Sequence, residues 1–262
     1  MLPPSRVAAA EYAKRRVLAD TTETRFGTFV QDPEHADRAA ATQFLDARLP
    51  SASEPPTTPA DDDAANDLLA RVDALYERAG RSHRVVAGVD TETAARLAPV
   101  LRRRGYERED YWALVPHLID SPDPTTDLDF STRSHGSDDA RAVHESVGRD
   151  PEGVDYAADV AGVLDGREVV ATLEGAPVGA AGWYVHRSGS GEAGPVARLT
   201  HVGIRPESQG RGVGAELIRV VVDRCPLPSE RIVVCATADH VGFYESLGFV
   251  RNAALWRFAS LP

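Results

Sequence analysis

The sequence has very little cysteine, methionine or lysine: two cysteines, one methionine and, among 29 basic residues, the single lysine Lys14. Two cysteines, Cys225 and Cys235, do not make a disulfide framework, and we expect both to be buried small hydrophobic residues. No apolar run is long enough to cross a bilayer, and the N-terminal residues lack the apolar core of a signal peptide. We therefore expect a cytoplasmic protein with no membrane partner.

The chain also has fewer basic than acidic residues, 29 against 40. The chain of 262 residues has a net charge of -11 and a pI of about 5.2. This balance argues against nucleic acid as a partner, although local arginines can still hold a small anionic ligand. With 42% hydrophobic residues the chain can bury one large core or two small ones.

Two stretches rich in Pro, Asp, Ser and Thr are predicted to be loops or linkers: Leu49 to Asp67 and Asp120 to Asp127. The second of them divides the chain into two parts, each of the size of a domain. We therefore expect an N-terminal domain over residues 1–120 and a C-terminal domain over residues 121–262.

The C-terminal part alternates between strand and helix patterns. The predicted order is strand, two helices, three strands, helix, strand, helix and strand. The segments are residues 127–133, 136–147, 156–165, 167–187 (a hairpin of two strands), 196–204, 214–225, 230–237, 239–249 and 250–261. Such an order predicts an α/β fold with a mixed sheet flanked by helices.

The chain contains an internal repeat, in which residues 77–116 resemble residues 224–262. The two copies differ at informative places. The acidic segment Asp61 to Asn66 occupies the place of Ser208 to Val213, and Leu101 occupies the place of Tyr244. We infer that the N-terminal copy lacks whatever chemistry the C-terminal copy has.

Three glycines, Gly210, Gly212 and Gly214, lie between a predicted strand and the start of a predicted helix. Glycine weakens a helix, but here it leaves backbone N–H groups bare at the positive end of the helix dipole. That arrangement binds anions, phosphate above all, and Arg205 and Arg211 can add charge. The loop lacks the lysine of a Walker motif and the glycine spacing of a dinucleotide fingerprint.

The loop together with the downstream segment "FYESLGF" resembles the GNAT superfamily of acyl-coenzyme A-dependent N-acetyltransferases. The family pattern [Q/R]-x-x-G-x-[G/A] is matched by Gln209, Gly212 and Gly214, and the family's tyrosine before "LGF" by Tyr244. The match covers about residues 127–262. The resemblance implies a GNAT fold, mostly antiparallel in its sheet, and a tandem arrangement with a degenerate, non-catalytic N-terminal half.

The resemblance also assigns site residues. Main-chain groups near Val202 and Ile204 would contact the pantetheine of acetyl-CoA, and one of them would polarise the thioester carbonyl. Tyr244 would act as general acid toward the departing thiolate. The coenzyme A pyrophosphate would lie on the loop formed by Gln209, Gly210, Arg211, Gly212, Val213, Gly214 and Ala215. The family's asparagine before the tyrosine is missing, because Ala238 to His240 occupies its place.

The general base is not identified by the sequence. The strand positions that alternate in line with Ile204 are Arg198, Thr200 and Val202, and none of them is a good base. His201 should face the other side unless the strand bulges there. Other candidates have weaker grounds: Glu152 and Asp155 for the acceptor site, and Trp183 and Tyr184, of which core packing is expected for at least one.

The expected activity is transfer of an acetyl group from acetyl-CoA to a primary amine by direct attack in a ternary complex. Two alternatives stay open, a non-catalytic acyl-CoA-binding regulatory module and an enzyme for a different nucleotide phosphate. No His, Cys or Asp cluster has the spacing of metal ligands, so no metal is expected. The sequence assigns neither the amine acceptor nor the oligomeric state.

Overall fold

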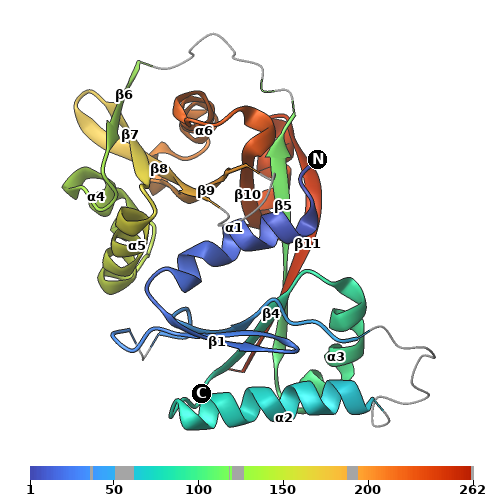
Figure 1. The fold of residues 1–262 in the computed structure, drawn as a ribbon. Helices are drawn as coiled ribbons and strands as arrows, with labels where there is room; N and C mark the ends of the chain where they lie inside the picture. The colour runs from blue at the N-terminus through green and yellow to red at the C-terminus, as the bar shows by residue number, and fades with distance from the viewer. Residues whose placement is uncertain (36–37, 51–61, 118, 120–126, 188–193, 261–262) are drawn as a thin grey trace. The chain divides into compact units, whose positions relative to one another are not determined.

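The computed structural model describes residues 1–35, 38–50, 62–117, 119, 127–187 and 194–260 (Figure 1). The described chain forms two compact units. Unit 1 contains Met1–Val17 and Ala113–Asn252, and unit 2 contains Leu18–Trp112 and Ala253–Pro262. Two strands pass from one unit into the other along the chain, β5 (Glu107–Pro116) and β11 (Phe249–Ser260).

Unit 1 has a mixed sheet whose strand order is β5-β10-β9-β8-β7-β6. The pairs β6–β7, β7–β8 and β8–β9 are antiparallel, and β9–β10 is parallel. Its strands are β6 (Leu128–Arg133), β7 (Arg167–Leu173), β8 (Ala176–His186), β9 (Val196–Ile204), β10 (Ile232–Thr237), the end of β5 and the start of β11. Its helices are α1 (Pro4–Arg16), α4 (Asp138–Ser146), α5 (Pro151–Val163), α6 (Val213–Arg224) and α7 (Ala238–Ser246).

Helices cover both faces of the unit 1 sheet. A Cβ at Gly203 would lie against Val143 and His144 of α4, whereas a Cβ at Gly179 would lie against Val213 and Leu217 of α6. Because Gly179 pairs with Ile204, the neighbour of Gly203, the two glycines face opposite sides of the sheet. Helix α4 packs on α5 on the first face, and α6 covers the second (Figure 1).

The N-terminal helix α1 packs on β8 and β9. The hydroxyl of Tyr184 donates a hydrogen bond to the carbonyl of Ala10 at 2.8 Å. Glu11 forms an ion pair with Arg198 of β9, with 2.6 Å between Oε2 and Nε. The side chains of Glu11 and Arg198 are 15% and 8% exposed, so this pair is largely removed from water. These contacts explain why residues 1–17 belong to unit 1.

Unit 2 has the strand order β1-β2-β3-β4-β11, with a parallel pair β3–β4 and antiparallel pairs elsewhere. The elements are β1 (Asp20–Thr24), β2 (Gly27–Gln31), β3 (Thr42–Leu45), α2 (Asp63–Arg78), β4 (Arg84–Gly88), α3 (Thr91–Arg103), the start of β5 and the end of β11. Trp256 and Phe258 of β11 are buried in the core of this unit, beside residues of α2 and α3.

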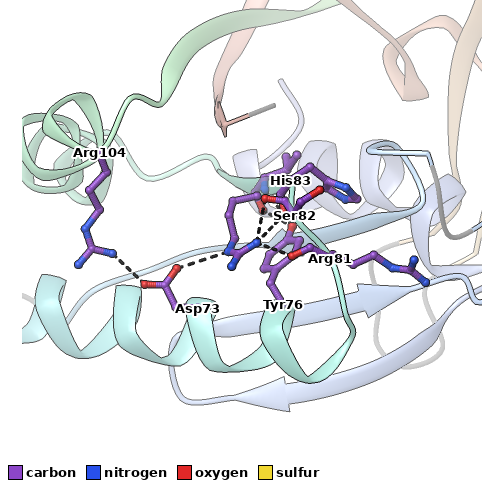
Figure 2. A network of polar contacts seen from close by, with 8 residues as sticks. Asp73, Tyr76, Arg81, Ser82, His83 and Arg104 are labelled. Atoms are coloured by element: carbon purple, nitrogen blue, oxygen red, sulfur yellow. Dashed lines mark hydrogen bonds and ion pairs between the residues drawn. The ribbon is translucent and has the colours of Figure 1, made fainter. Parts of the chain in front are cut away.

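A polar network links α2 to the start of β4 (Figure 2). Asp73 accepts a hydrogen bond from Arg104 at 2.9 Å, and its other oxygen lies 3.5 Å from Nε of Arg84. Arg84 also donates to three successive backbone carbonyls, those of Arg81, Ser82 and His83. These contacts hold the turn before β4 within unit 2.

The predicted element order of the C-terminal part is confirmed, from β6 through β11, and so is the mixed, mostly antiparallel α/β sheet. Gly248 follows α7 with φ 87°, as expected of a glycine after a helix end. The repeat also appears in the element order, as α2-β4-α3-β5 and α6-β10-α7-β11.

The division into units differs from the expected boundaries of 1–120 and 121–262. Helix α1 belongs with the later part of the chain, because its ion pair and hydrogen bond are made with β8 and β9. Residues 253–262 belong with the earlier part, because β11 pairs with β4 from Trp256 to Ser260. Most of both predicted linkers, residues 51–61 and 120–126, lies outside the described residues.

Candidate active site

The strands β9 and β10 diverge. They pair at Ala197 and Arg198 only, opposite Ile232 and Val233. In the described part of the chain, the edge of β9 that faces β10 therefore has no strand ladder from Leu199 to Ile204. Backbone N–H groups along such an edge are available to a ligand that pairs with them as a strand would, whereas the carbonyls of Val202 and Ile204 already accept side-chain hydrogen bonds. Val202 and Ile204, predicted to contact pantetheine, lie in this segment.

Strand β9 bulges at His201. The pairing with β8 shifts between Ala180 and Gly182, and His201 has φ 56°. A bulge turns the affected side chain to the other face of the sheet. The expectation that Arg198 and Thr200 align with Ile204 is therefore wrong: they lie on the face of α1 and α4, whereas Ile204 lies on the face of α6.

The glycine loop opens α6 as predicted. Gly210 and Gly212 have φ 73° and 82°, in the left-handed region that L side chains rarely adopt. Gly212 is the N-cap of α6, and no side chain caps this helix start. The side chain of Gln209 turns back and donates to the carbonyl of Ile204 at 3.0 Å. Arg211 is exposed beside the bare helix start.

The loop, the end of β9 and helix α7 converge. A Cβ at Gly214 would lie 3.4 Å from the side chain of Ile204 and 3.4 Å from the ring of Phe243. The predicted pyrophosphate loop, the predicted pantetheine strand and the helix of Tyr244 are therefore neighbours. Val213 is buried and Ala215 is half-buried, so both belong to the base of this loop.

Tyr244 lies on α7 and is 7% exposed. Its ring makes edge-on contacts with Phe243 and Phe249, with centroid distances of 5.1 and 5.5 Å. Burial raises the pKa of Tyr244 to about 12. The phenol is therefore protonated at neutral pH and can act as a hydrogen-bond donor or acid.

A pocket that the sequence analysis missed lies between α4, α5 and the sheet. It holds about 260 Å³ of empty space, part of it open to solvent. Its polar lining is His135, His144, Arg149, Glu168 and His201, and small residues of α5 complete it. Glu168 is fully buried, and its Oε1 lies 2.6 Å from Nε2 of His144. The other oxygen, Oε2, lies 3.8 Å from Nδ1 of His135.

Glycines make the room for these histidines. A Cβ at Gly182 would lie 2.4 Å from the ring of His135, closer than real atoms approach, and a Cβ at Gly203 would lie 3.2 Å from Nδ1 of His144. The rings of His135 and His144 lie 5.5 and 6.0 Å from the ring of His201, measured between centroids. Glycines of β8 and β9 therefore leave the space that the rings of His135 and His144 occupy.

Arg149 connects the pocket with the predicted acid. Its guanidinium donates to the carbonyl of Val202 at 3.2 Å. Burial lowers the pKa of Arg149, while electrostatic interactions with Glu168 and Tyr244 act in the opposite direction. Arg149 therefore lies within electrostatic range of both the pocket carboxylate and the Tyr244 phenol.

The remaining sequence candidates are not part of this pocket. Glu152 and Asp155 are exposed on α5, and Asp155 pairs with Arg141. Trp183 and Tyr184 are both buried in the core, at 4% and 1% exposure. In sequence, the histidines that form the pocket stand far apart on a loop, a helix and a strand. The sequence feature that could have indicated the pocket is glycine at Gly182 and Gly203, the strand positions that face the rings of His135 and His144.

Unit 2 differs at the corresponding helix start. Helix α2 begins at Asp62, whose carboxylate accepts a hydrogen bond from the backbone N–H of Ala65 at 3.0 Å. Arg96 pairs with the same carboxylate at 2.7 Å and neutralises it. A side chain thus occupies the place where α6 is bare, and Leu101 is buried where unit 1 has Tyr244. Asp61, also part of the acidic segment, lies outside the described residues.

These features define a class of protein: an α/β unit with two diverging strands, a bare glycine-opened helix and, beside them, a short helix that carries a buried tyrosine. Residues 136–249 match the family model described as the acetyltransferase (GNAT) family. The chain therefore carries a GNAT acetyltransferase domain, and the family uses acetyl-CoA as its co-substrate.

Solved structures agree in fold. A GCN5-related N-acetyltransferase from Kribbella flavida is 18% identical, with a TM-score of 0.69 over 100% of this chain and 97% of that one. A functionally unknown conserved protein from Staphylococcus epidermidis is 14% identical, with a TM-score of 0.68 over 95% and 96%. A tandem GNAT protein from the clavulanic acid biosynthesis pathway is 15% identical, with a TM-score of 0.54 over 84% and 74%. No curated protein matches the sequence.

Two absences hold for the described residues. None of their helices has the length and apolar character that a membrane span needs. No group of three or more His, Cys, Asp or Glu side chains among them is arranged to hold a metal ion.

The glycine loop offers a matched pair of substitutions. Gly210 and Gly175 have φ 73° and 81°, and a Cβ at either position meets no atom within 4 Å. Alanine therefore costs a similar backbone strain at both, about 1–2 kcal/mol. Gly210→Ala should also weaken coenzyme A binding at least about tenfold, by displacing one charge-assisted hydrogen bond.

Isothermal titration with coenzyme A checks this prediction. Gly175→Ala, in the turn between β7 and β8, should bind coenzyme A like the unmodified protein. Equal affinities of the two variants would show that the loop does not hold the pyrophosphate.

Proposed function

We propose that unit 1 transfers an acetyl group from acetyl-CoA to a primary amine by direct attack in a ternary complex. One observation carries the proposal: the bare glycine-opened start of α6, the unpaired edge of β9 and helix α7, which carries Tyr244, lie next to one another. The start of α6 would bind the pyrophosphate of acetyl-CoA, the edge of β9 would bind its pantetheine arm, and Tyr244 would act on its thioester.

The loop residues suit a pyrophosphate. Backbone N–H groups from Gln209 to Ala215 would bind its oxygens at the positive end of the α6 dipole. Gly210, Gly212 and Gly214 leave the approach open, and Arg211 would add a charge-assisted contact. Unlike α2, this helix start has no side-chain hydrogen bond at its N-cap that would compete for the same N–H groups.

The unpaired edge of β9 suits the pantetheine arm, whose amides would pair with main-chain groups near Val202 and Ile204. When bound, acetyl-CoA supplies the thioester carbon that the amine attacks. A backbone N–H of β9 would stabilise the negative charge that develops on the carbonyl oxygen. Tyr244, protonated at neutral pH, would donate its proton to the departing sulfur.

We also propose that unit 2 is non-catalytic. The carboxylate of Asp62 accepts a hydrogen bond from a backbone N–H at the start of α2, so that N–H is already occupied and not free for a phosphate. Leu101 replaces the phenol. Unit 2 would then contribute to the protein without binding acetyl-CoA itself.

A thermal-shift comparison of ligands tests the proposal. A ligand at 100 times its Kd stabilises the folded protein by about 2.7 kcal/mol. We expect acetyl-CoA and coenzyme A to raise the melting temperature, and ATP and NAD to leave it unchanged. Stabilisation by ATP or NAD without stabilisation by coenzyme A would contradict the proposal and point to a different nucleotide-phosphate enzyme.

A further inference from the structure

The histidine-lined pocket contains none of the residues proposed to bind coenzyme A, but its Arg149 donates a hydrogen bond to the carbonyl of Val202 on the proposed pantetheine strand. We propose, on the basis of the function proposed above, that this pocket receives the amine of the acceptor and that His201 is the general base. The proposal rests on the place of His201 in the strand, its access to the pocket and the fixed groups around it.

The place of His201 is the first argument. The residue directly precedes Val202, whose main chain would lie along the pantetheine arm. The bulge turns the His201 ring to the α4 face, among the rings of His135 and His144. Its φ of 56° is unusual for a residue other than glycine, and strained backbone persists where the surrounding structure enforces it.

Access is the second argument. Glu168 and the rings of His135 and His144 are almost completely buried, at 0%, 3% and 5% exposure. His201 is half-buried and lines the pocket. Among the described residues, no protein group hydrogen-bonds a ring nitrogen of His201. A nitrogen lone pair can therefore meet a ligand in the pocket.

The protonation state of His201 also suits a base. Burial lowers the pKa of His201 well below its ordinary value, and the positive charges of His135, Arg149, His144 and Lys14 act in the same direction. The ring is therefore neutral at pH 7 and able to accept a proton. Its neighbours are fixed, because His144 is held by Glu168 at 2.6 Å.

The proton balance is complete with these groups. The amine nitrogen forms a bond to the carbonyl carbon of the thioester, and one of its protons passes to the ring nitrogen of His201. The carbon–sulfur bond then breaks, and the sulfur takes the proton of Tyr244. Both side chains return to their starting state by proton exchange with water. Arg149 interacts electrostatically with both proton-transfer groups, Tyr244 and His201.

His201→Gly tests the proposal, because glycine suits φ 56° and relieves the backbone strain. We expect turnover with a primary amine to fall about 10²-fold, while the melting temperature stays equal or rises and coenzyme A affinity is unchanged. Added imidazole should restore part of the turnover, since the lost ring leaves space for it. His186→Gln, a histidine at the end of β8 outside the pocket, serves as the control with full turnover.

The outcomes separate this inference from the proposed function. If the unmodified protein acetylates an amine and His201→Gly does so equally fast, His201 is not the base. A slow His201→Gly variant that has lost stability and gains nothing from imidazole would also overturn the inference, since the ring would then be structural. If the unmodified protein binds no coenzyme A, the proposed function itself fails.

Discussion

Tyr244→Phe should lower kcat about 10³-fold and leave the Kd for coenzyme A unchanged. The substitution removes only the hydroxyl, so the edge-on contacts of the ring with Phe243 and Phe249 persist. Without the phenol proton, the sulfur leaves as an unprotonated thiolate, and the barrier to carbon–sulfur cleavage rises. Because burial raises the pKa of Tyr244 to about 12, deprotonation of this group should cause no loss of activity near neutral pH.

Tyr184→Phe provides the control for this prediction. Its hydroxyl is buried and donates to the carbonyl of Ala10, so its loss should cost about 1 kcal/mol of stability. It should leave kcat within about twofold, because Tyr184 faces α1 and not the reaction site. Steady-state kinetics measures kcat for both variants. An unchanged kcat in Tyr244→Phe would show that Tyr244 is not the general acid.

Glu11→Gln should lower the free energy of unfolding by about 3–5 kcal/mol. Arg198 is paired with Glu11 in a largely buried position, and the neutral amide would leave the guanidinium without a counter-charge. Urea denaturation followed by circular dichroism measures the change. The exposed pair Glu245–Arg251 supplies the control, since Glu245→Gln should cost no more than about 1 kcal/mol.

The contribution of the Glu11 ion pair to the free energy of unfolding should also depend on pH. Burial alone would raise the pKa of Glu11, but the charges of Arg198, Lys14 and Arg15 outweigh burial and hold the pKa well below 4.5. The stability from this depressed pKa is complete above pH 4.5 and is lost as the pH falls further. The difference between the unmodified protein and Glu11→Gln should therefore shrink in acid. A difference that does not change with pH would contradict the ion-pair account.

The sequence predicted the local features of unit 1 well. Strand alternation, the glycines before α6 and Gly248 after α7 are each determined by neighbours along the chain. The family pattern around Gln209, Gly212 and Gly214 predicted the GNAT domain, which the family match confirms. The roles of the individual loop residues and of Tyr244 stay predictions.

The features that sequence reasoning missed depend on contacts between distant residues. The bulge at His201 is a local change of register that the alternation of β9 does not reveal, although it reverses which side chains face α4. The pocket joins His135, His144 and Glu168, which reach one another only because glycines of β8 and β9 leave room. The position of α1 in unit 1 depends on the ion pair between Glu11 and Arg198, which lie 187 residues apart in the sequence.

The most direct test of the account is turnover by the intact chain. The protein is incubated with acetyl-CoA and a panel of primary amines, while free thiol and acetylated amine are measured together by colorimetry and mass spectrometry. The account predicts that at least one amine gives thiol and N-acetyl product in equal amounts, and that Tyr244→Phe abolishes most of both. Tight binding of acetyl-CoA with no acetylated product from any amine would contradict it and leave a non-catalytic acyl-CoA-binding protein.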